Sequence, residues 1–408
     1  MQLRRELLKF ILVKMNLNDF DITIIGGSFA GMSAALALAM VSPDLKIAII
    51  EKQDIVNHDR KPDGRGYAIS NSSLRLFKEI GIADQILQEA GTIQDIRITD
   101  YKSAATLDFL SKQADEKNFG ALIESFIIHN ALRNKLVLQK NIILFCPNSY
   151  QDIQFLRNKV TVELDNKIIL ESKLLLACDG RFSPLRKLFN IHTTEKNYQQ
   201  KAIVFNIKHQ RSHENIAYEK FLPGGPLAIL PLKNQHHSSI VWIAPDKVAE
   251  AILELDKENF VQQLHKKMEN CLGEAEVISE KFSYPLIMVE AQKFYHEKML
   301  LVGDASCGVH PIAGQGLNLG LGGIKILQDL VKEYLFSGLD ISSDSLIEAY
   351  NKKARREAIK MVVATDVLNS LFETKSLSIG LARDLGLAVV NKIPRLKKIF
   401  IRNAGGKN

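Results

Sequence analysis

The sequence predicts an α/β fold, and three observations support that prediction. A short apolar strand, a glycine-rich turn, a small-residue helix and a second strand follow one another within residues 20–51. Residues 201–243 are rich in predicted strands, and the chain after Gly323 has a helical pattern. Alternating strands and helices predict a parallel sheet, whereas consecutive strands predict an antiparallel one. We therefore expect a parallel-sheet domain, a mostly antiparallel sheet and a helical C-terminal segment.

Length and composition narrow the class of protein. The chain has 408 residues, 46% of them hydrophobic, which is enough for two interpenetrating domains. A net charge of +7 is a mild excess and does not predict nucleic-acid binding. No apolar run approaches the roughly 20 residues of a membrane span. The four cysteines are scattered, so we predict reduced thiols in a cytoplasmic protein, with no metal site.

A dinucleotide-binding turn is predicted after the first strand. Gly26-Gly-Ser-Phe-Ala-Gly31 follows the strand 20–25, and Glu51 ends the next strand, 20 residues after Gly31 (51 − 31). Gly26 permits the tight turn, Gly31 lets the helix pack closely, and the helix N-terminus directs N–H groups at a pyrophosphate. Glu51 is expected to bind a ribose hydroxyl. Ser28 replaces the middle glycine of this Rossmann-type pattern, so its Cβ crowds the pyrophosphate while its hydroxyl can donate to it.

Two later segments each contain an apolar strand that ends in aspartate and glycine. The first ends in Asp179-Gly180 and the second in Gly303-Asp304. Glycines then crowd the start of a predicted helix, at Gly314, Gly316, Gly320, Gly322 and Gly323. Each costs a helix up to about 1 kcal/mol relative to alanine. A flat isoalloxazine ring against the helix N-terminus explains that cost, because the positive helix end stabilises the negative charge of reduced flavin.

Together the three segments resemble the aromatic-ring flavoprotein monooxygenases, the group typified by para-hydroxybenzoate hydroxylase. They look closest to the ubiquinone-biosynthesis branch, the 2-polyprenylphenol hydroxylases. The most specific match is His310-Pro-Ile-Ala-Gly-Gln-Gly-Leu-Asn-Leu-Gly320. Further matches are Arg65-Gly-Tyr-Ala-Ile-Ser70, Gly224-Gly-Pro-Leu-Ala-Ile-Leu-Pro231, Tyr284-Pro-Leu286 and the tail 396–405. The resemblance covers essentially everything from Asp21 onward.

The resemblance implies FAD as the cofactor and places residues around it. The residues expected to bind FAD are Gly26, Ser28, Gly31, Glu51, Arg65, Asp179, Gly180, Gly303 and Asp304. Among them, Asp179 and Gly180 would belong to a site shared with the reductant, and Asp304 would bind the ribityl chain. The flavin ring would be bordered by His310, Pro311, Gly314, Gln315, Gly316, Leu317 and Asn318.

No acid–base residue is predicted, and His310 is interpreted as structural. Two positions depart from the family pattern. Cys307 stands where histidine is frequent, and Gly323 stands where aspartate often follows the long motif. Neither position is expected to do chemistry.

The same reasoning divides the chain into stretches. We predict an N-terminal extension (1–14), a Rossmann-type FAD-binding domain in two parts (15–187 and 286–345), a substrate domain with a mostly antiparallel sheet (188–285) and a helical C-terminal segment (346–408). Residues 1–14 have an amphipathic pattern that fits either a short membrane-surface helix or an extension upstream of a start at Met15. The second interpretation is preferred.

The implied reaction is the hydroxylation of a polyprenylated phenol in ubiquinone biosynthesis. It would use O₂ and transient NAD(P)H, through a C4a-hydroperoxide of the flavin. Basic residues of the 201–243 strands fall mostly in predicted loops, which favours a hydrophobic phenol over an aromatic acid. Two alternatives stay open: a flavoenzyme acting on another lipid or small aromatic, and a catalytically silent scaffold of a biosynthetic complex.

Peripheral attachment to the inner face of the membrane also stays open. Lys392, Lys397, Lys398 and Arg402 cluster near the C-terminus, and each can add about 1 kcal/mol on an anionic surface. The simpler interpretation of this cluster is a solvated helix face.

Overall fold

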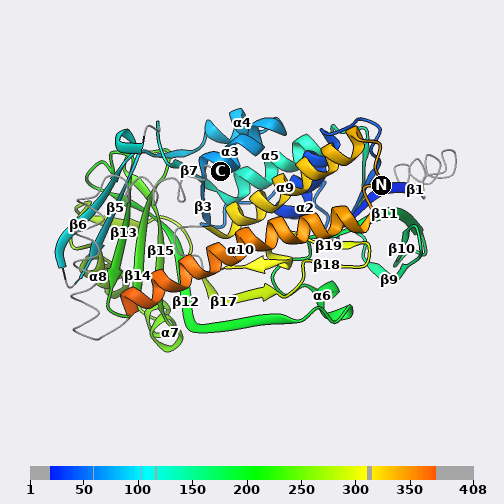
Figure 1. The fold of residues 1–408 in the computed structure, drawn as a ribbon. Helices are drawn as coiled ribbons and strands as arrows, with labels where there is room; N and C mark the ends of the chain where they lie inside the picture. The colour runs from blue at the N-terminus through cyan, green and yellow to red at the C-terminus, as the bar shows by residue number, and fades with distance from the viewer. Residues whose placement is uncertain (1–18, 58, 102, 115–116, 310–314, 374–408) are drawn as a thin grey trace.

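The computed structural model describes residues 19–373 apart from 58, 102, 115–116 and 310–314. Within these residues it confirms the α/β fold, with an eight-stranded sheet, a nine-stranded sheet and a three-stranded sheet (Figure 1). The predicted N-terminal extension, the basic C-terminal cluster and the site residues His310, Pro311 and Gly314 lie outside the described residues.

The eight-stranded sheet has a parallel centre. Its strands run in the order β8 (Ile142–Phe145), β2 (Ile47–Ile50), β1 (Asp19–Ile25), β11 (Ile169–Ala177) and β19 (Met299–Leu301). All four neighbouring pairs are parallel. β2, β8 and β19 are wholly apolar, and β11 ends in four buried apolar residues (174–177), because both faces of a parallel sheet are covered. Antiparallel strands extend it: β18 (Tyr295–His296), β10 (Val160–Leu164) and β9 (Tyr150–Phe155).

Long helices pack against this sheet and close the main hydrophobic core (Figure 1). They are α2 (Phe29–Ala39), α5 (Ser125–Leu136), α9 (Gln315–Phe336) and α10 (Asp344–Glu373). Buried polar side chains fix their positions. Gln328 of α9 donates to Ala37 O at 3.1 Å, and the Tyr350 hydroxyl of α10 donates to Leu301 O at 3.0 Å. Shorter helices are α3 (Asn71–Glu79), α4 (Ala83–Leu87) and α6 (Pro184–Leu188).

The nine-stranded sheet is almost entirely antiparallel. Its order is β20 (Cys307–Gly308), β17 (Phe282–Ala291), β12 (Thr193–His209), β15 (His237–Pro245), β14 (Gly225–Pro231), β13 (Ile216–Leu222), β5 (Asp95–Asp100) and β6 (Ser103–Leu110), with β16 (Ala275–Val277) beside β12. Among the described strands of this sheet, β13 and β5 are the one pair that runs in parallel. Because β5, β6 and β20 belong to this sheet, it is not confined to residues 188–285. The division of the chain into domains stays a prediction.

Each face of the nine-stranded sheet packs against a different partner. One face forms a core with α7 (Asp246–Leu253) and α8 (Lys257–Met268). The other face packs in part on the three-stranded sheet of β3 (Gly66–Ile69), β7 (Gly120–Glu124) and β4 (Gly91–Ile93). β3 begins directly after Arg65, which is predicted to bind FAD. The face of the nine-stranded sheet that packs on β3 is therefore turned toward the predicted cofactor segments, and we call it the inner face.

None of the helices in the described ranges is both long enough and apolar enough to cross a membrane.

The turn between β1 and α2 packs so closely against neighbouring backbone that no side chain fits there. Gly26 has a φ of +103°, and a Cβ there would lie 2.3 Å from Cys178 O. A Cβ on Gly31 would lie 1.8 Å from Gly26 O. The turn is thus pressed between the first turn of α2 and the end of β11, and only glycine fits at either position.

We predict that Gly31→Ala destabilises the protein, because the added methyl overlaps a backbone carbonyl that has nowhere to move. The expected loss is about 1–3 kcal/mol or more in the free energy of unfolding. Urea denaturation measures it. Gly322→Ala is the matched control: its Cβ would meet nothing within 4 Å, so it should gain up to about 1 kcal/mol of helix propensity. Equal stability of Gly31→Ala and the wild type would contradict the packing described.

Candidate functional site

The predicted site residues gather at one edge of the parallel sheet. Gly26 follows β1, Glu51 follows β2, Asp179 follows β11, and Gly303 and Asp304 follow β19. Parallel neighbours end at the same edge, so segments far apart in sequence converge there. The carboxyl ends of such strands are where α/β proteins bind nucleotides.

The Glu51 carboxylate is held by the turn itself. Gly27 N–H donates to Glu51 Oε2 at 2.6 Å, and Gln53 N–H donates to Oε1 at 2.8 Å. A Cβ on Gly27 would lie 2.8 Å from Glu51 Cβ. Gly27 thus positions the Glu51 carboxylate, a role not predicted from the sequence. The adjacent glycines Gly26 and Gly27 are the sequence feature that could have indicated it.

The N-terminus of α2 is open to a ligand. Ser28 precedes the helix, is exposed, and makes no side-chain hydrogen bond to cap it. The first N–H groups of a helix have no intrahelical acceptors. Together with the helix dipole they form a site for an anion, and the Ser28 hydroxyl is free to contribute.

A buried arginine ties the turn after β11 to the turn after β19. Arg186 is 2% exposed and donates to Ala305 O at 2.8 Å and to Arg181 O at 2.7 Å. Burial lowers the pKa of Arg186 and raises that of Asp179. Asp179 Oδ2 accepts from Leu185 N–H at 3.0 Å. Asp179 and Arg186 therefore shape the turn that carries Gly180.

Asp304 forms an ion pair that the sequence analysis missed. Arg181 Nη2 lies 3.3 Å from Asp304 Oδ2, and Arg181 Nη1 donates to Ile287 O in β17 at 3.1 Å. A Cβ on Gly308 would lie 2.6 Å from Arg181 Nε, so glycine there makes room for the arginine. Asp304 Oδ1 has no partner among the described residues. The pair orients Asp304 and leaves that oxygen for a ligand.

Asn318 joins the start of α9 to β3. Its Oδ1 accepts from Ser70 N–H at 3.0 Å, and its Nδ2 donates to Ala68 O at 2.8 Å. The helix start that carries Gln315, Gly316 and Leu317 is thereby fixed beside the strand that begins next to Arg65.

Arg65 reaches from its loop to the nine-stranded sheet. Its Nε donates to Asp63 Oδ2 at 2.9 Å, and its guanidinium lies 5.6 Å from the centre of the Tyr284 ring in β17. It therefore lies between the loop after β2 and the inner face.

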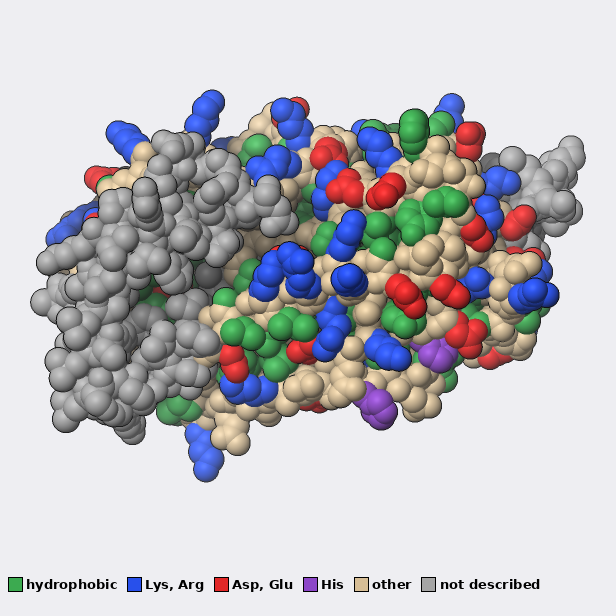
Figure 2. Space-filling view, in the orientation of Figure 1, with side chains coloured by type: hydrophobic (Ala, Val, Ile, Leu, Met, Phe, Trp, Pro, Cys, Tyr) green, Lys and Arg blue, Asp and Glu red, His purple; other side chains and the backbone are tan. Residues whose placement is uncertain are grey.

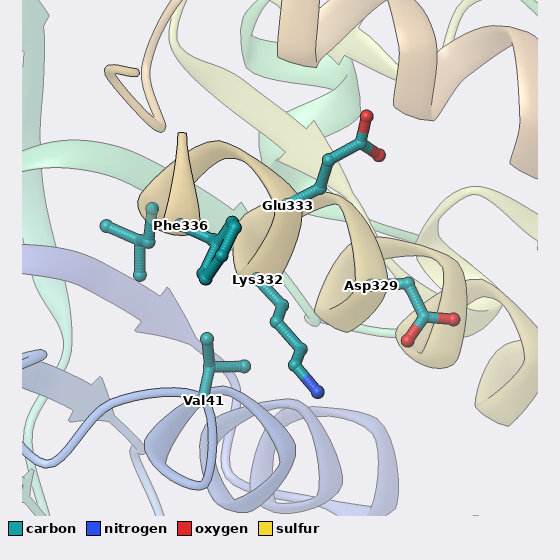
Figure 3. Close-up of a pocket in the computed structure, with 6 residues that line it drawn as sticks. Val41, Asp329, Lys332, Glu333 and Phe336 are labelled. Atoms are coloured by element: carbon teal, nitrogen blue, oxygen red, sulfur yellow. The ribbon is translucent and has the colours of Figure 1, made fainter. Parts of the chain in front are cut away.

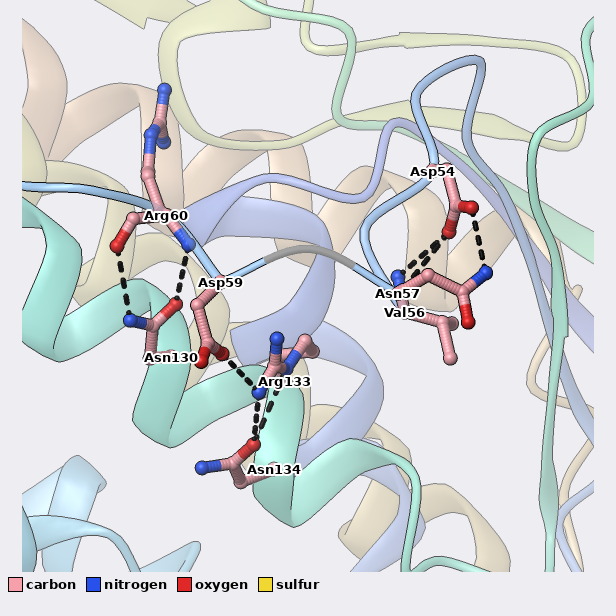
Figure 4. A network of polar contacts seen from close by, with 8 residues as sticks. All are labelled: Asp54, Val56, Asn57, Asp59, Arg60, Asn130, Arg133 and Asn134. Carbon is pink, nitrogen blue, oxygen red and sulfur yellow. Dashed lines mark hydrogen bonds and ion pairs between the residues drawn. The ribbon is translucent and has the colours of Figure 1, made fainter.

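The loop after β2 is fastened to α5 by the network in Figure 4. Asn130 accepts from Arg60 N–H at 3.0 Å and donates to Arg60 O at 3.1 Å, and Arg133 pairs with Asp59 at 2.6 Å. The Arg60 guanidinium lies 5.9 Å from the centre of the Phe29 ring, at the start of α2. A cation thus stands near the open helix N-terminus.

His129 of α5 packs edge-on against Phe29, with ring centres 6.1 Å apart. Burial lowers its pKa to about 4. His129 is consequently neutral at pH 7 and supports the turn by packing.

These residues fit an FAD molecule. A Cβ on Gly180 or on Gly316 would meet nothing within 4 Å, so open space adjoins both backbones. The uncapped α2 N-terminus suits the pyrophosphate, and the strand-end acid suits a ribose. Of the predicted site residues, the structure brings together those after β1, β2, β11 and β19, and places Gln315 to Asn318 beside β3.

A shallow surface hollow of about 450 Å³ lies elsewhere, between the C-terminal ends of α2 and α9 (Figure 3). It is lined by Val41, Asp329, Lys332, Glu333, Leu335 and Phe336, and contains no predicted site residue.

The face in Figure 2 mixes basic, acidic and hydrophobic side chains.

Known proteins resemble the chain over nearly its full length. The ubiquinone hydroxylase UbiL of Rhodospirillum rubrum is 31% identical over 387 residues, covering 95% of this chain and 89% of that protein. The ubiquinone hydroxylase UbiM of Neisseria meningitidis is 30% identical over 394 residues, covering 95% and 84%. The crystal structure of p-nitrophenol 4-monooxygenase PnpA from Pseudomonas putida shares the fold, with a TM-score of 0.76 at 14% identity, covering 96% and 100%.

The family described as FAD binding domain matches residues 19–365, which include every strand and nearly every helix described above. With that match and two relatives of at least 30% identity along nearly the whole chain, the protein belongs to the FAD binding domain family of flavoproteins.

Proposed function

We propose that this protein is an FAD-dependent monooxygenase that hydroxylates the aromatic ring of a polyprenylated phenol in ubiquinone biosynthesis. The observation that carries the proposal is the likeness over nearly the full chain to two proteins named ubiquinone hydroxylases, joined to a strand-end site that fits FAD. Relatives named ubiquinone biosynthesis monooxygenase in animals support the same reaction class.

In this proposal the described residues hold FAD along the strand ends. The α2 N-terminus, with Gly26, Ser28 and Gly31, binds the pyrophosphate, and Glu51 binds the adenosine ribose. Asp304, oriented by Arg181, binds the ribityl chain. Asn318 keeps the start of α9 in place, so that the positive helix end and the backbone at Gly316 face the flavin ring.

Bound FAD supplies the redox chemistry, in which NAD(P)H is oxidised and one atom of O₂ enters the ring. The chain itself orients the substrate and excludes water from the site. The sequence carries no second nucleotide-binding glycine turn, so we assign NAD(P)H a transient role near Asp179 and Gly180.

The inner face of the nine-stranded sheet supports a hydrophobic substrate. A buried apolar cluster there comprises Ala202, Val204, Ile243 and Leu286. Two lysines of these strands point to the opposite face and are engaged there: Lys201 pairs with Glu250 of α7 at 2.6 Å, and Lys220 pairs with Glu269 after α8 at 2.5 Å. These lysines therefore do not serve the carboxylate of a small aromatic acid on the inner face.

We further propose that the substrate is met at a membrane surface, and that assembly with other biosynthetic enzymes aids its delivery. A polyprenyl tail gains about 0.8 kcal/mol for each CH₂ removed from water, so free diffusion of such a substrate is rare.

The proposed function is tested by incubating the purified yellow protein with a short-chain prenylphenol, NADH or NADPH and ¹⁸O₂. One ¹⁸O atom in the hydroxylated ring is expected, detected by mass spectrometry. Product only from small aromatic acids would favour another flavoenzyme activity. A colourless protein that FAD does not restore would favour the scaffold.

We predict that Glu51→Ala weakens FAD binding by about 10- to 100-fold, because a hydrogen bond to a charged group is worth about 1.5–3 kcal/mol. Equilibrium titration of the apoprotein with FAD measures this change. Glu51→Gln can keep the contact from Gly27 N–H through its amide oxygen, but its NH₂ group cannot accept from Gln53 N–H, so a loss smaller than that of Glu51→Ala is expected. The neighbouring exposed Lys52→Ala serves as the control. An unchanged affinity in Glu51→Ala would remove this residue from the site.

We predict that Asp304→Ala purifies largely as apoprotein while its circular dichroism stays that of the wild type. The physical reason is the lost hydrogen bond to the ribityl chain, together with an Arg181 left without its partner. The absorbance ratio of flavin to protein gives the occupancy. Asp329→Ala on the exposed surface of α9 is the matched control. Full occupancy and activity in Asp304→Ala would contradict its assignment.

A further inference from the structure

One carboxylate lies within an otherwise apolar row across the inner face. One residue from each of seven neighbouring strands forms this row, and each is paired with the next. In order across the sheet they are Leu107, Ile98, Glu219, Ala228, Val241, Val204 and Phe282. Directly paired residues point to the same face of a sheet. Val241 and Val204 belong to the inner-face cluster, so Glu219 of β13 also points to the inner face.

Glu219 has no partner among the described residues, either as a hydrogen-bond acceptor or in an ion pair. Its side chain is half-buried, so space large enough for water adjoins it. It nevertheless lies deep among apolar neighbours, and this burial alone raises its pKa to about 7. The residue paired with it on β14 is Ala228, whose small side chain carries no polar group. Solvent therefore reaches the Glu219 carboxylate, while apolar side chains surround much of it.

The next residue along the strand shows the contrast. Lys220 points to the opposite face, is 5% exposed, and satisfies its charge with Glu269 Oε2 and with Met268 O at 3.0 Å. A buried charge is normally paired in this way, because desolvation without a partner costs stability. The acid at position 219 lacks such compensation, which points to a partner that arrives from outside the chain.

Other polar groups share the inner face with Glu219. Asp100 lies two residues beyond Ile98 on β5, and Tyr284 lies on β17 under Arg65. On β12, Asn206 donates to Glu124 Oε1 of β7 at 3.1 Å. Glu124 therefore has a donor within the protein, and Arg65 has Asp63. Glu219 is the carboxylate set in the apolar row itself.

We propose that Glu219 is a catalytic residue that accepts the hydrogen bond, and then the proton, of the substrate's phenol hydroxyl. This inference rests on the proposed function and names the base for that reaction. The phenol O–H bond breaks, an O–H bond forms on a Glu219 oxygen, and the electron pair stays on the phenol oxygen, where it activates the ring. The proton returns to water after product leaves.

Only the ionised carboxylate accepts a proton, so the base is active above its pKa. In the FAD-loaded wild type, kcat/KM for a short-chain prenylphenol should therefore rise as pH passes about 7 and then level off. Glu219→Gln should lose this rise. At pH 8 it should form product about 100- to 10,000-fold more slowly while still oxidising NADH. Glu276→Gln, on β16 of the same sheet with a side chain 63% exposed, should match the wild type.

A binding measurement gives a readout without turnover. The wild type should bind the prenylphenol about 10- to 100-fold more tightly than its O-methyl ether, because the ether has no hydrogen to donate to the carboxylate. Flavin absorbance or protein fluorescence follows both titrations. Glu219→Gln should lose most of this preference, and Glu276→Gln should keep it.

Stability provides an internal check on folding. The unfolded chain has the ordinary glutamate pKa, near 4.5, so the folded state binds this proton more tightly. Its stability contribution is therefore full below pH 4.5 and declines as pH rises to 7. The melting temperature of Glu219→Gln should exceed that of the wild type at pH 8, and the difference should shrink at pH 5.

The possible failures are distinguishable. If the wild type hydroxylates prenylphenols and Glu219→Gln keeps the rate, the pH profile and the preference for phenol over ether, Glu219 is not the base and the proposed function stands. If the wild type neither binds nor hydroxylates prenylphenols, the proposed function fails and the assignment of Glu219 fails with it.

Discussion

The close packing of the Gly26 turn against the end of β11 is the constraint on which the site depends. With 1.8 Å between a notional Gly31 Cβ and Gly26 O, helix and strand approach as closely as backbone allows. This approach brings the uncapped start of α2 to the edge where β1, β2, β11 and β19 all end. The uncapped helix end and the carboxylates of Glu51 and Asp304 therefore lie at one edge of the sheet, where the proposed FAD would extend across the strand ends.

Buried polar side chains keep the rest of the site in register with that edge. Arg186 is desolvated but bonded to two carbonyls, so the cost of burying it is offset by charge-assisted hydrogen bonds. It connects turns that belong to different strands. Asn318 does the same for α9 and β3 through backbone groups on both sides of its amide. Since each of these groups is satisfied within the protein, they support the site without competing for its ligand.

The two faces of the nine-stranded sheet have different surroundings, because side chains alternate between them along each strand. Successive residues of β13 point to opposite faces, so Tyr218 and Lys220 meet the α8 side while Ala217 and Glu219 meet the inner face. One face is closed by two helices and contains the tryptophan-centred core around Trp242. The other carries an apolar row in which Glu219 is the one carboxylate, with Asp100, Asn206 and Tyr284 nearby on the same face.

The sequence by itself determined the local features, because they depend on short spacings: the strand, turn and helix at 20–39, the acid 20 residues past Gly31 (51 − 31), and two further strands ending at Asp179 and Asp304. Tertiary structure alone decided which distant residues meet. Arg181 and Asp304 pair across 123 residues, and β5 joins β13 in a sheet predicted from residues 188–285 alone. The face on which Glu219 lies depends on register, and a slip of one residue would turn it away. No local pattern encodes that choice, since it follows from how the hydrophobic faces of separate segments pack together.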